Sequence, residues 1–295
     1  MVVLTRPEGT EPQDLHLSRR GLAGLMFAGY ALAAVSANAE PVHTDDEGLI
    51  AETTHLEPNG LPAYVARPKA PGRHGAVIVV NEVFGIHEYV RDICRRFAKL
   101  GYVAVAPQFF YRQDPNNELP GTTDFKVIME QVRKSPNAMV MGDVGTALRW
   151  LEHQPFVAKQ HIGITGFCWG GGVVWMACAA YPEIKAGVAW YGPLGHPKQP
   201  NPADPTRPYP VDIAGQLKAP VLGLYGGKDQ GISAEDIDAM RAALKKAGKS
   251  SSDIVVYPEA QHGFHADYRP SYDAAAAKDG WNRLLAFFRA HGVTA

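Results

Sequence analysis

A cysteine in a glycine-rich turn is the residue of this sequence best placed to do chemistry. Cys168 stands at the centre of a Gly-x-Cys-x-Gly motif at residues 166–170. An alternating apolar run at residues 161–166 precedes the motif and a longer apolar run at residues 173–180 follows it, which suits a buried strand followed by a buried helix. A strand, a sharp turn and a helix in this order would present the thiol as a nucleophile, with the helix N-terminus directed at the charge that develops beside it.

This turn has two other interpretations. A free cysteine is often a small core residue rather than a nucleophile, so the motif alone is not specific. A phosphate-binding loop would carry Lys and then Ser or Thr after its last glycine, whereas Val173 and Val174 follow Gly172 here. The nucleophile interpretation therefore depends on a histidine and an acid that can reach the cysteine.

Two later side chains supply that acid and that histidine. Asp229 follows an apolar strand expected at residues 220–226, and His262 follows one expected at residues 253–257. The chain order of nucleophile, acid and histidine is that of the α/β-hydrolase fold. The imidazole would take the thiol proton, and the carboxylate would fix the tautomer and stabilise the imidazolium. The sequence therefore predicts a catalytic triad of Cys168, His262 and Asp229.

The elements that must position these residues alternate between strands and helices. This alternation predicts an α/β fold, a mainly parallel central sheet with helices on both faces, preceded by an N-terminal β-hairpin. Ligands of such sheets bind beyond the carboxyl ends of the strands. The hairpin is expected at residues 50–56 and 61–67, further strands at 76–80, 102–106 and 186–191, and helices at 88–100, 123–134, 137–154, 234–247 and 272–290.

Four motifs resemble the dienelactone hydrolase family (carboxymethylenebutenolidases), and the resemblance extends from about residue 49 to the end. They are Asn81-Glu82-Val83-Phe84-Gly85, Gly166-Phe167-Cys168-Trp169-Gly170-Gly171, Tyr225-Gly226-Gly227-Lys228-Asp229 and Gln261-His262-Gly263-Phe264. The resemblance implies hydrolysis of an ester or lactone through a cysteine acyl-enzyme. It also implies that Glu82 lies beside the thiol and moves on substrate binding to help form the thiolate. A plain ion pair between Glu82 and an arginine is the alternative interpretation.

The remaining site residues are expected around this centre. The backbone amides of Trp169 and Val83 would form the oxyanion hole. The resemblance implies two arginines that bind a substrate carboxylate. Arg112 matches the first of these arginines. The position of the second is occupied by Ala266. Arg269, three residues farther along the chain, is therefore the candidate for the second, in a different register. Aromatic candidates for the substrate wall are Tyr111, Trp190, Tyr191 and Trp169.

Composition narrows the possible partners. The chain has 295 residues, 46% of them hydrophobic, and a formal net charge of −1, which argues against binding to nucleic acid or to an anionic membrane. Three cysteines leave an odd one, so no disulfide framework is expected. The eleven histidines form no His-x-x-x-His motif, and we expect neither a metal nor a cofactor. The expected partner is a small-molecule ester or lactone.

The first 39 residues resemble an export signal. Paired Arg19 and Arg20 precede an apolar run at residues 22–35, and Ala37-Asn38-Ala39 forms a cleavage-type sequence. The apolar run is too short to span a membrane, which needs about 20 residues. The sequence therefore predicts use of the twin-arginine export machinery, cleavage after Ala39, and a periplasmic or secreted domain at residues 40–295. An uncleaved tail on a cytoplasmic protein is the alternative.

Two further functions stay open at this point. A broad-specificity esterase or thioesterase for small acyl groups would use the same residues. A non-catalytic binding protein of the same fold would use Cys168 only as a reactive thiol.

Overall fold

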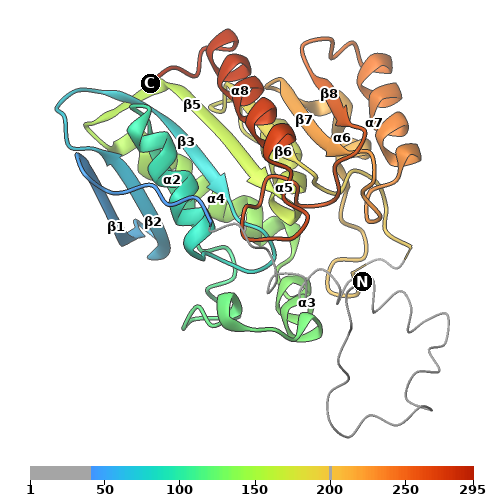
Figure 1. The fold of residues 1–295 in the computed structure, drawn as a ribbon, viewed down its shortest axis with the longest axis horizontal. Coiled ribbons are helices and arrows are strands. Elements are labelled where there is room, and N and C mark those ends of the chain that lie inside the picture. The colour runs from blue at the N-terminus through green and yellow to red at the C-terminus, as the bar shows by residue number, and fades with distance from the viewer. Residues whose placement is uncertain (1–40, 199–200) are drawn as a thin grey trace, which may run out of the picture.

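The computed structural model describes residues 41–198 and 201–295, which are organised around one eight-stranded sheet (Figure 1). The strand order is β1-β2-β4-β3-β5-β6-β7-β8. Strands β3 to β8 are parallel to their neighbours in this series, whereas β2 pairs antiparallel with both β1 and β4. The strands are β1 (Leu49–Leu56), β2 (Leu61–Pro68), β3 (His74–Val80), β4 (Val103–Pro107), β5 (Val157–Phe167), β6 (Ala186–Trp190), β7 (Val221–Gly226) and β8 (Asp253–Tyr257).

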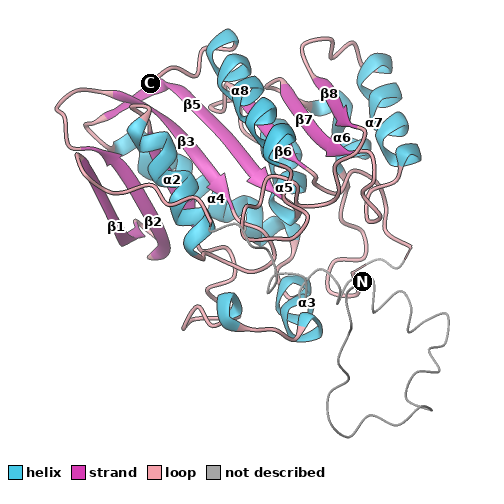
Figure 2. Ribbon diagram, in the orientation of Figure 1, coloured by secondary structure: helices cyan, strands magenta, loops and turns pink. Residues whose placement is uncertain are grey.

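Helices cover both faces of the sheet (Figure 2). On one face α2 packs against α8, where the rings of Phe97 and Trp281 lie 4.8 Å apart. On the other face α4 packs against α5, and the Tyr181 hydroxyl donates a hydrogen bond to the Met141 carbonyl at 2.5 Å. The helices are α2 (Glu88–Lys99), α3 (Phe125–Arg133), α4 (Asn137–His153), α5 (Trp169–Ala180), α6 (Pro210–Ile213), α7 (Ala234–Lys246) and α8 (Ala274–Ala290), with the 3-10 turns η3 (Leu119–Gly121) and η4 (Ala214–Gln216). The expected fold class is therefore confirmed.

The predicted boundaries differ from the structure chiefly around the cysteine. Strand β5 begins at Val157, four residues before the expected start, and α5 begins at Trp169 rather than at residue 173. The prediction was wrong for α5 because three consecutive glycines weaken a helical pattern in the sequence. In the structure they are required, since a Cβ at Gly171 would lie 2.6 Å from the Trp190 carbonyl oxygen. The first turn of α5 is thus pressed against the ends of the strands.

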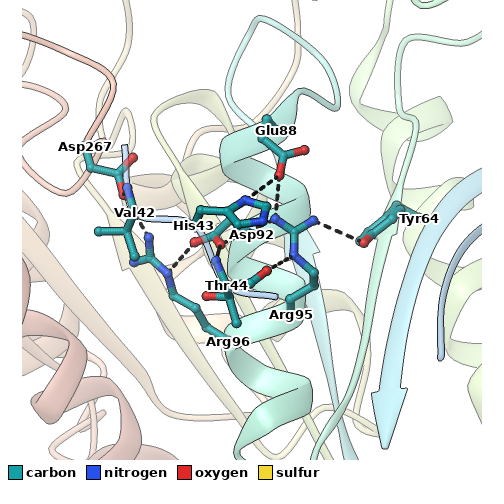
Figure 3. Close-up of polar contacts among 9 residues, drawn as sticks. All are labelled: Val42, His43, Thr44, Tyr64, Glu88, Asp92, Arg95, Arg96 and Asp267. Carbon is teal, nitrogen blue, oxygen red and sulfur yellow. Dashed lines mark hydrogen bonds and ion pairs between the residues drawn. The ribbon is translucent and has the colours of Figure 1, made fainter. Parts of the chain in front are cut away.

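A segment before β1, residues 42–47, lies along α2, and we call it the N-terminal strap (Figure 3). The backbone amide of Thr44 donates to the carboxylate of Asp92 at 2.5 Å. Arg96 then bridges Asp92, at 2.5 Å, and Asp267, at 2.8 Å. These contacts join the strap to α2 and to the loop that follows β8.

The described residues contain no helix that is long and apolar enough to cross a membrane. Within the same ranges no group of three or more His, Cys, Asp or Glu side chains is arranged to hold a metal ion. The predicted export signal at residues 1–39 lies outside the described part of the chain.

Candidate active site

The candidate site lies at the carboxyl ends of β3 and β5, where the direction in which successive strands are added to the sheet reverses. Strand β3 pairs with β4 on one side and with β5 on the other, so the connections that leave β3 and β5 diverge at their carboxyl ends. In open parallel sheets this divergence creates a place for a ligand. Glu82 follows β3 and Cys168 follows β5, so both side chains lie at this point.

Cys168 occupies a strained backbone position between β5 and α5. Its φ of 54° and ψ of −121° fall in a region that residues other than glycine rarely adopt. The conformation is fixed from both sides, because the amide of Cys168 donates to the Trp190 carbonyl at 3.0 Å and its carbonyl accepts from Gly171 at 2.9 Å. Strain that the surrounding structure enforces is characteristic of functional positions.

Cys168 also differs from the other two cysteines in exposure. Cys94 and Cys178 are buried, whereas Cys168 is partly exposed. Burial raises the pKa of the Cys94 and Cys178 thiols, which keeps them protonated and unreactive. Only Cys168, among the three, combines solvent access with the N-terminus of a helix.

The structure brings Asp229 and His262 together. Nδ1 of His262 lies 2.8 Å from Oδ2 of Asp229, and the carboxylate is fully buried. The second oxygen, Oδ1, accepts hydrogen bonds from the amides of Gly231 at 2.7 Å and Ile232 at 3.2 Å. The loop after β7 therefore holds the carboxylate in one orientation toward the imidazole.

The imidazole is in turn next to the sulfur. Burial lowers the pKa of His262, but the charge of Cys168 and hydrogen bonds with Asp229 and Cys168 outweigh it and raise the pKa from 6.5 to about 10. The ring of Tyr191 contacts the imidazole with centroids 5.2 Å apart. The imidazole therefore lies between a buried carboxylate and the sulfur, and both contacts favour its protonated form.

Glu82 is held by two side chains of the loop after β8. The Tyr268 hydroxyl donates a hydrogen bond to Oε2 of Glu82, and Nη2 of Arg269 lies 3.1 Å from Oε1. This arginine contact is an ion pair without hydrogen-bond alignment. Burial lowers the pKa of Arg269, but its interactions with Glu82 first and then with Tyr268 and Cys168 keep that pKa well above its usual value. Arg269 therefore pairs with Glu82, and its binding of a substrate carboxylate stays a prediction.

The side chains around this ion pair are uncharged at neutral pH. Burial lowers the pKa of His87 to about 4 and that of His265 to about 3. Burial also raises the pKa of Tyr89, Tyr191 and Tyr268 well above 10.0. The charge of Glu82 is therefore balanced chiefly by Arg269.

Arg112 lies after β4 in a bidentate ion pair. Its Nη1 and Nη2 lie 2.8 and 2.9 Å from the two carboxylate oxygens of Asp143 on α4. This hydrogen bonding outweighs burial and raises the pKa of Arg112. The guanidinium also stacks on the half-buried ring of Tyr111, 4.3 Å from its centroid. Whether Arg112 contacts substrate stays a prediction at this point.

Trp169 follows Cys168 directly in sequence, and Val83 follows Glu82 after β3. Trp169 is the first residue of α5, where backbone amides lack intrahelical acceptors. Both side chains belong to a second apolar cluster, which we call the α3 cluster. It consists of Val83, Phe110, Leu119, Ile128 and Val132, with Phe84, Phe125, Met129 and Trp169 packed against it. The use of the two amides as oxyanion donors stays a prediction.

The expectation that Trp190 lines the substrate site was wrong. Its ring is fully buried, and its Nε1 donates to Thr165 at 3.1 Å. The ring packs beside Gly280 of α8, because this face of β6 points to the core. Trp190 contributes to the site only through its carbonyl, which accepts from Cys168.

Sequence reasoning missed two residues of this neighbourhood. Tyr268 contacts Glu82, and the only hint of this contact in the sequence is that Tyr268 directly precedes the candidate Arg269. Asp143 gave no signal, because it lies 31 residues from Arg112 in an ordinary helical pattern.

The sheet, the cysteine on its sharp turn, and the acid and histidine at the ends of later strands define an α/β-hydrolase. The model of the dienelactone hydrolase family matches residues 61–292. The chain therefore belongs to the dienelactone hydrolase family, and it is a hydrolase of the kind that cleaves esters or lactones.

Similar proteins agree with this assignment. A protein of Methylorubrum extorquens, provisionally named carboxymethylenebutenolidase, is 46% identical over 282 residues, which cover 94% of each chain. One of Escherichia coli K12 with the same provisional name is 44% identical over 92% of this chain and 98% of its own. A crystal structure from Klebsiella pneumoniae, provisionally assigned as a dienelactone hydrolase, is 46% identical with a TM-score of 0.74, covering 82% of this chain and 98% of that one.

Proposed function

We propose that this protein hydrolyses a carboxylic ester or lactone through a thioester acyl-enzyme formed on Cys168. The observation that carries the proposal is the contact of His262 with both Asp229, at 2.8 Å, and the sulfur of Cys168. A cysteine at the N-terminus of a buried helix, with an oriented imidazolium beside it, has the arrangement needed for nucleophilic attack. The names of the relatives point to a lactone within this substrate class.

The chemical steps follow from these positions. After Glu82 accepts the thiol proton, the thiolate of Cys168 attacks the acyl carbon, and the carbonyl electron pair moves to an oxygen that the Trp169 and Val83 amides stabilise. Collapse of this intermediate breaks the bond to the leaving oxygen, which takes a proton from His262. Neutral His262 then removes a proton from water, whose oxygen attacks the thioester. The acid leaves, and the released thiolate takes its proton back from Glu82 while His262 is again protonated.

Glu82 acts on the charge state of the sulfur in this proposal. While Tyr268 and Arg269 hold it, the negative charge of Glu82 is neutralised by the guanidinium, 3.1 Å away. A shift of the carboxylate toward the sulfur on substrate binding would let it accept the thiol proton, as the family resemblance implies. Tyr268 and Arg269 would then set how readily Glu82 moves.

The test compares turnover with thiol chemistry. Iodoacetamide should label Cys168 stoichiometrically and abolish turnover of 4-nitrophenyl acetate. Replacement of Cys168 or His262 by alanine should lower kcat by about 10³-fold or more, since triad members act as a unit. Cys94→Ala, a change at a buried thiol away from the strand ends, is the matched control and should keep most of the activity. Full turnover by Cys168→Ala would rule out the acyl-enzyme, and labelling without any turnover would favour a thiol-bearing binding protein.

We also propose that the protein is exported by the twin-arginine route and acts in the periplasm or outside the cell. The support is the Arg19-Arg20 pair, the apolar run after it and the Ala37-Asn38-Ala39 sequence. Mass spectrometry of the protein from the native host should find a chain that begins at Glu40. An intact N-terminus recovered from the cytoplasmic fraction would contradict the proposal.

A further inference from the structure

We propose that a cavity between the N-terminal strap and α8 is a second binding site, which takes a small aromatic carboxylate with an acceptor oxygen at its far end. We call it the strap cavity. Its volume of about 310 Å³ lies at the lower end of the range for small-molecule sites, about 300–1,000 Å³. The strap, α2, α8 and the loop after β8 form its wall, and none of the candidate catalytic side chains is among the described residues that line it. Binding there therefore does not depend on the proposed reaction.

His265 is the polar side chain buried most deeply in this wall. It is 3% exposed, and its ring contacts those of Trp190 and Trp281 with centroids 4.4 and 5.9 Å apart. Its Nδ1 lies 2.7 Å from the Tyr89 hydroxyl, whereas no described residue makes a hydrogen bond with Nε2. Nε2 keeps access to the cavity that His265 lines. A fixed and nearly buried nitrogen without a partner is a ready contact for a ligand.

The imidazole proton of His265 lies on Nε2. Burial lowers the pKa of His265 to about 3, so the ring is neutral at physiological pH and carries one N–H. The buried Tyr89 hydroxyl has no other hydrogen-bond partner among the described residues, so it donates its proton to Nδ1. Nε2 is therefore the donor, and it fits a ligand oxygen such as that of a carbonyl group.

The wall beside His265 is aromatic and apolar. Trp281 and Tyr272 are half-buried and line the cavity. Val42, which is 49% exposed, adds an apolar side chain from the strap (Figure 3). A flat apolar ring gains from contact with such surfaces and with aromatic side chains in particular. The middle part of a matching ligand is therefore aromatic.

Lys278 supplies the charge at the mouth of the cavity. It is exposed and makes no ion pair with another described residue. Arg96, the other cation of the wall, is already balanced by Asp92 and Asp267. None of the described side chains that line the cavity is acidic. A carboxylate at the mouth thus finds an unpaired cation there, while the acceptor oxygen at the other end of the ligand reaches Nε2 of His265.

The probe 4-acetylbenzoate carries these three groups and tests the site on the full chain. Calorimetry should give a Kd of about 1 mM or tighter, as suits a ligand of this size. The isosteric 4-isopropylbenzoate lacks the acceptor and 4-acetylbenzamide lacks the charge, so each should bind about three- to tenfold more weakly. NMR of the imidazole nitrogens should show a shift of Nε2 of His265 on titration with the acetyl compound. Equal affinity for all three compounds, or no binding up to about 10 mM, would overturn the proposal.

Two variants assign the contacts. Lys278→Gln should weaken 4-acetylbenzoate about three- to tenfold and leave 4-acetylbenzamide unchanged. Lys246→Gln, at an exposed lysine of α7, is the matched control and should alter neither affinity. His265→Phe should remove the preference for the acetyl over the isopropyl compound. Because Lys278 is exposed, its variant keeps the proposal testable if the change at buried His265 prevents folding.

Alkylation of Cys168 separates the strap cavity from the candidate active site. Protein treated with iodoacetamide should bind 4-acetylbenzoate with the affinity of untreated protein, because Cys168 is not among the residues that line the strap cavity. If alkylation abolished binding while Lys278→Gln left it unchanged, the probe would occupy the candidate active site instead, and the strap cavity would not be a second binding site.

Discussion

At the residue scale, the proton on His262 links the candidate chemistry to stability. Its pKa of about 10 exceeds the ordinary value of 6.5, so the folded state binds a proton that the unfolded chain releases between these values. This contribution to stability is complete below about pH 6.5 and is lost as the pH rises toward 10. We predict that the free energy of unfolding falls across this interval, and that His262→Ala removes most of the slope.

A second measurement separates the causes of this raised pKa. Cys168 supplies the first of the contributions that raise it, and Asp229 supplies the next. Cys168→Ser should therefore lower the pKa of His262, while the contact with Asp229 keeps it above 6.5. Titration of the imidazole nitrogens by NMR measures this directly. An unchanged pKa in the serine variant would mean that the sulfur and the imidazole do not interact.

The hydroxyl of Tyr268 gives a further prediction at this scale. Tyr268→Phe removes a hydrogen bond to the buried Glu82 carboxylate and should lower the free energy of unfolding by about 1.5–3 kcal/mol. The pH dependence of Cys168 alkylation should shift as well, since Glu82 would then be held by Arg269 alone. Denaturation in urea and iodoacetamide kinetics measure the two effects.

Tyr272→Phe is the control for this change. Tyr272 lies in the same loop, and its hydroxyl makes no hydrogen bond with another described residue. Its loss should alter stability by less than about 0.5 kcal/mol. Equal effects of the two phenylalanine variants, with no change in the alkylation profile, would contradict the role of Tyr268.

At the scale of elements, the contact between the first turn of α5 and the strand ends decides where the sulfur lies. A Cβ at Gly171 would lie 2.6 Å from a backbone oxygen of β6, so Gly171→Ala must push the helix away from the sheet. We predict a loss of about 3 kcal/mol or more in stability, as strained sites allow, together with loss of turnover. Thermal unfolding and 4-nitrophenyl acetate assays measure both.

A glycine on the neighbouring helix provides the control. Gly142 lies within α4, and a Cβ there meets nothing within 4 Å. Gly142→Ala should therefore stabilise the protein by about 0.4–1 kcal/mol without affecting turnover. Similar losses of stability and turnover in both variants would mean that close packing at the turn is not what excludes a side chain from Gly171.

The same turn marks how far the sequence could predict the structure. The strands and the order of Cys168, Asp229 and His262 were predictable, because apolar runs and strand-end positions are local features of the chain. The start of α5 was not predictable, since its glycines are explained only by contacts with β3, with β6 and with the segment that follows β6. Trp190 was misplaced for a related reason: a strand's apolar residues do not reveal which face meets a helix. The pair of Arg112 and Asp143 needed the fold itself, because it joins a loop and a helix far apart in sequence.

At the scale of the whole molecule, the N-terminal strap joins segments that are remote in sequence (Figure 3). The amide of Val42 donates to Asp267 at 3.3 Å, in the loop that also carries Tyr268 and Arg269. Arg96 of α2 lies between Asp267 and Asp92. The start of the described chain is thus connected through α2 to the residues that hold Glu82.

Asp92 is the residue on which this connection depends most. Its side chain is 1% exposed and accepts from the amide of Thr44 while it pairs with Arg95 and Arg96. Asp92→Asn removes the anion from a buried ion pair, and we predict a loss of about 3–5 kcal/mol in the free energy of unfolding. Hydrogen exchange at the Thr44 amide should accelerate more than exchange in β5, because the strap loses its charged acceptor first.

The pair of Asp279 with Arg283 in α8 is the matched control. It has the same spacing of four residues and a similar distance, 2.6 Å, but its side chains are about half exposed. Asp279→Asn should therefore cost no more than about 1 kcal/mol, because water screens exposed pairs. If both variants lost the same stability, burial would not account for the strength of the Asp92 network, and the strap would have to be held by its backbone contacts instead.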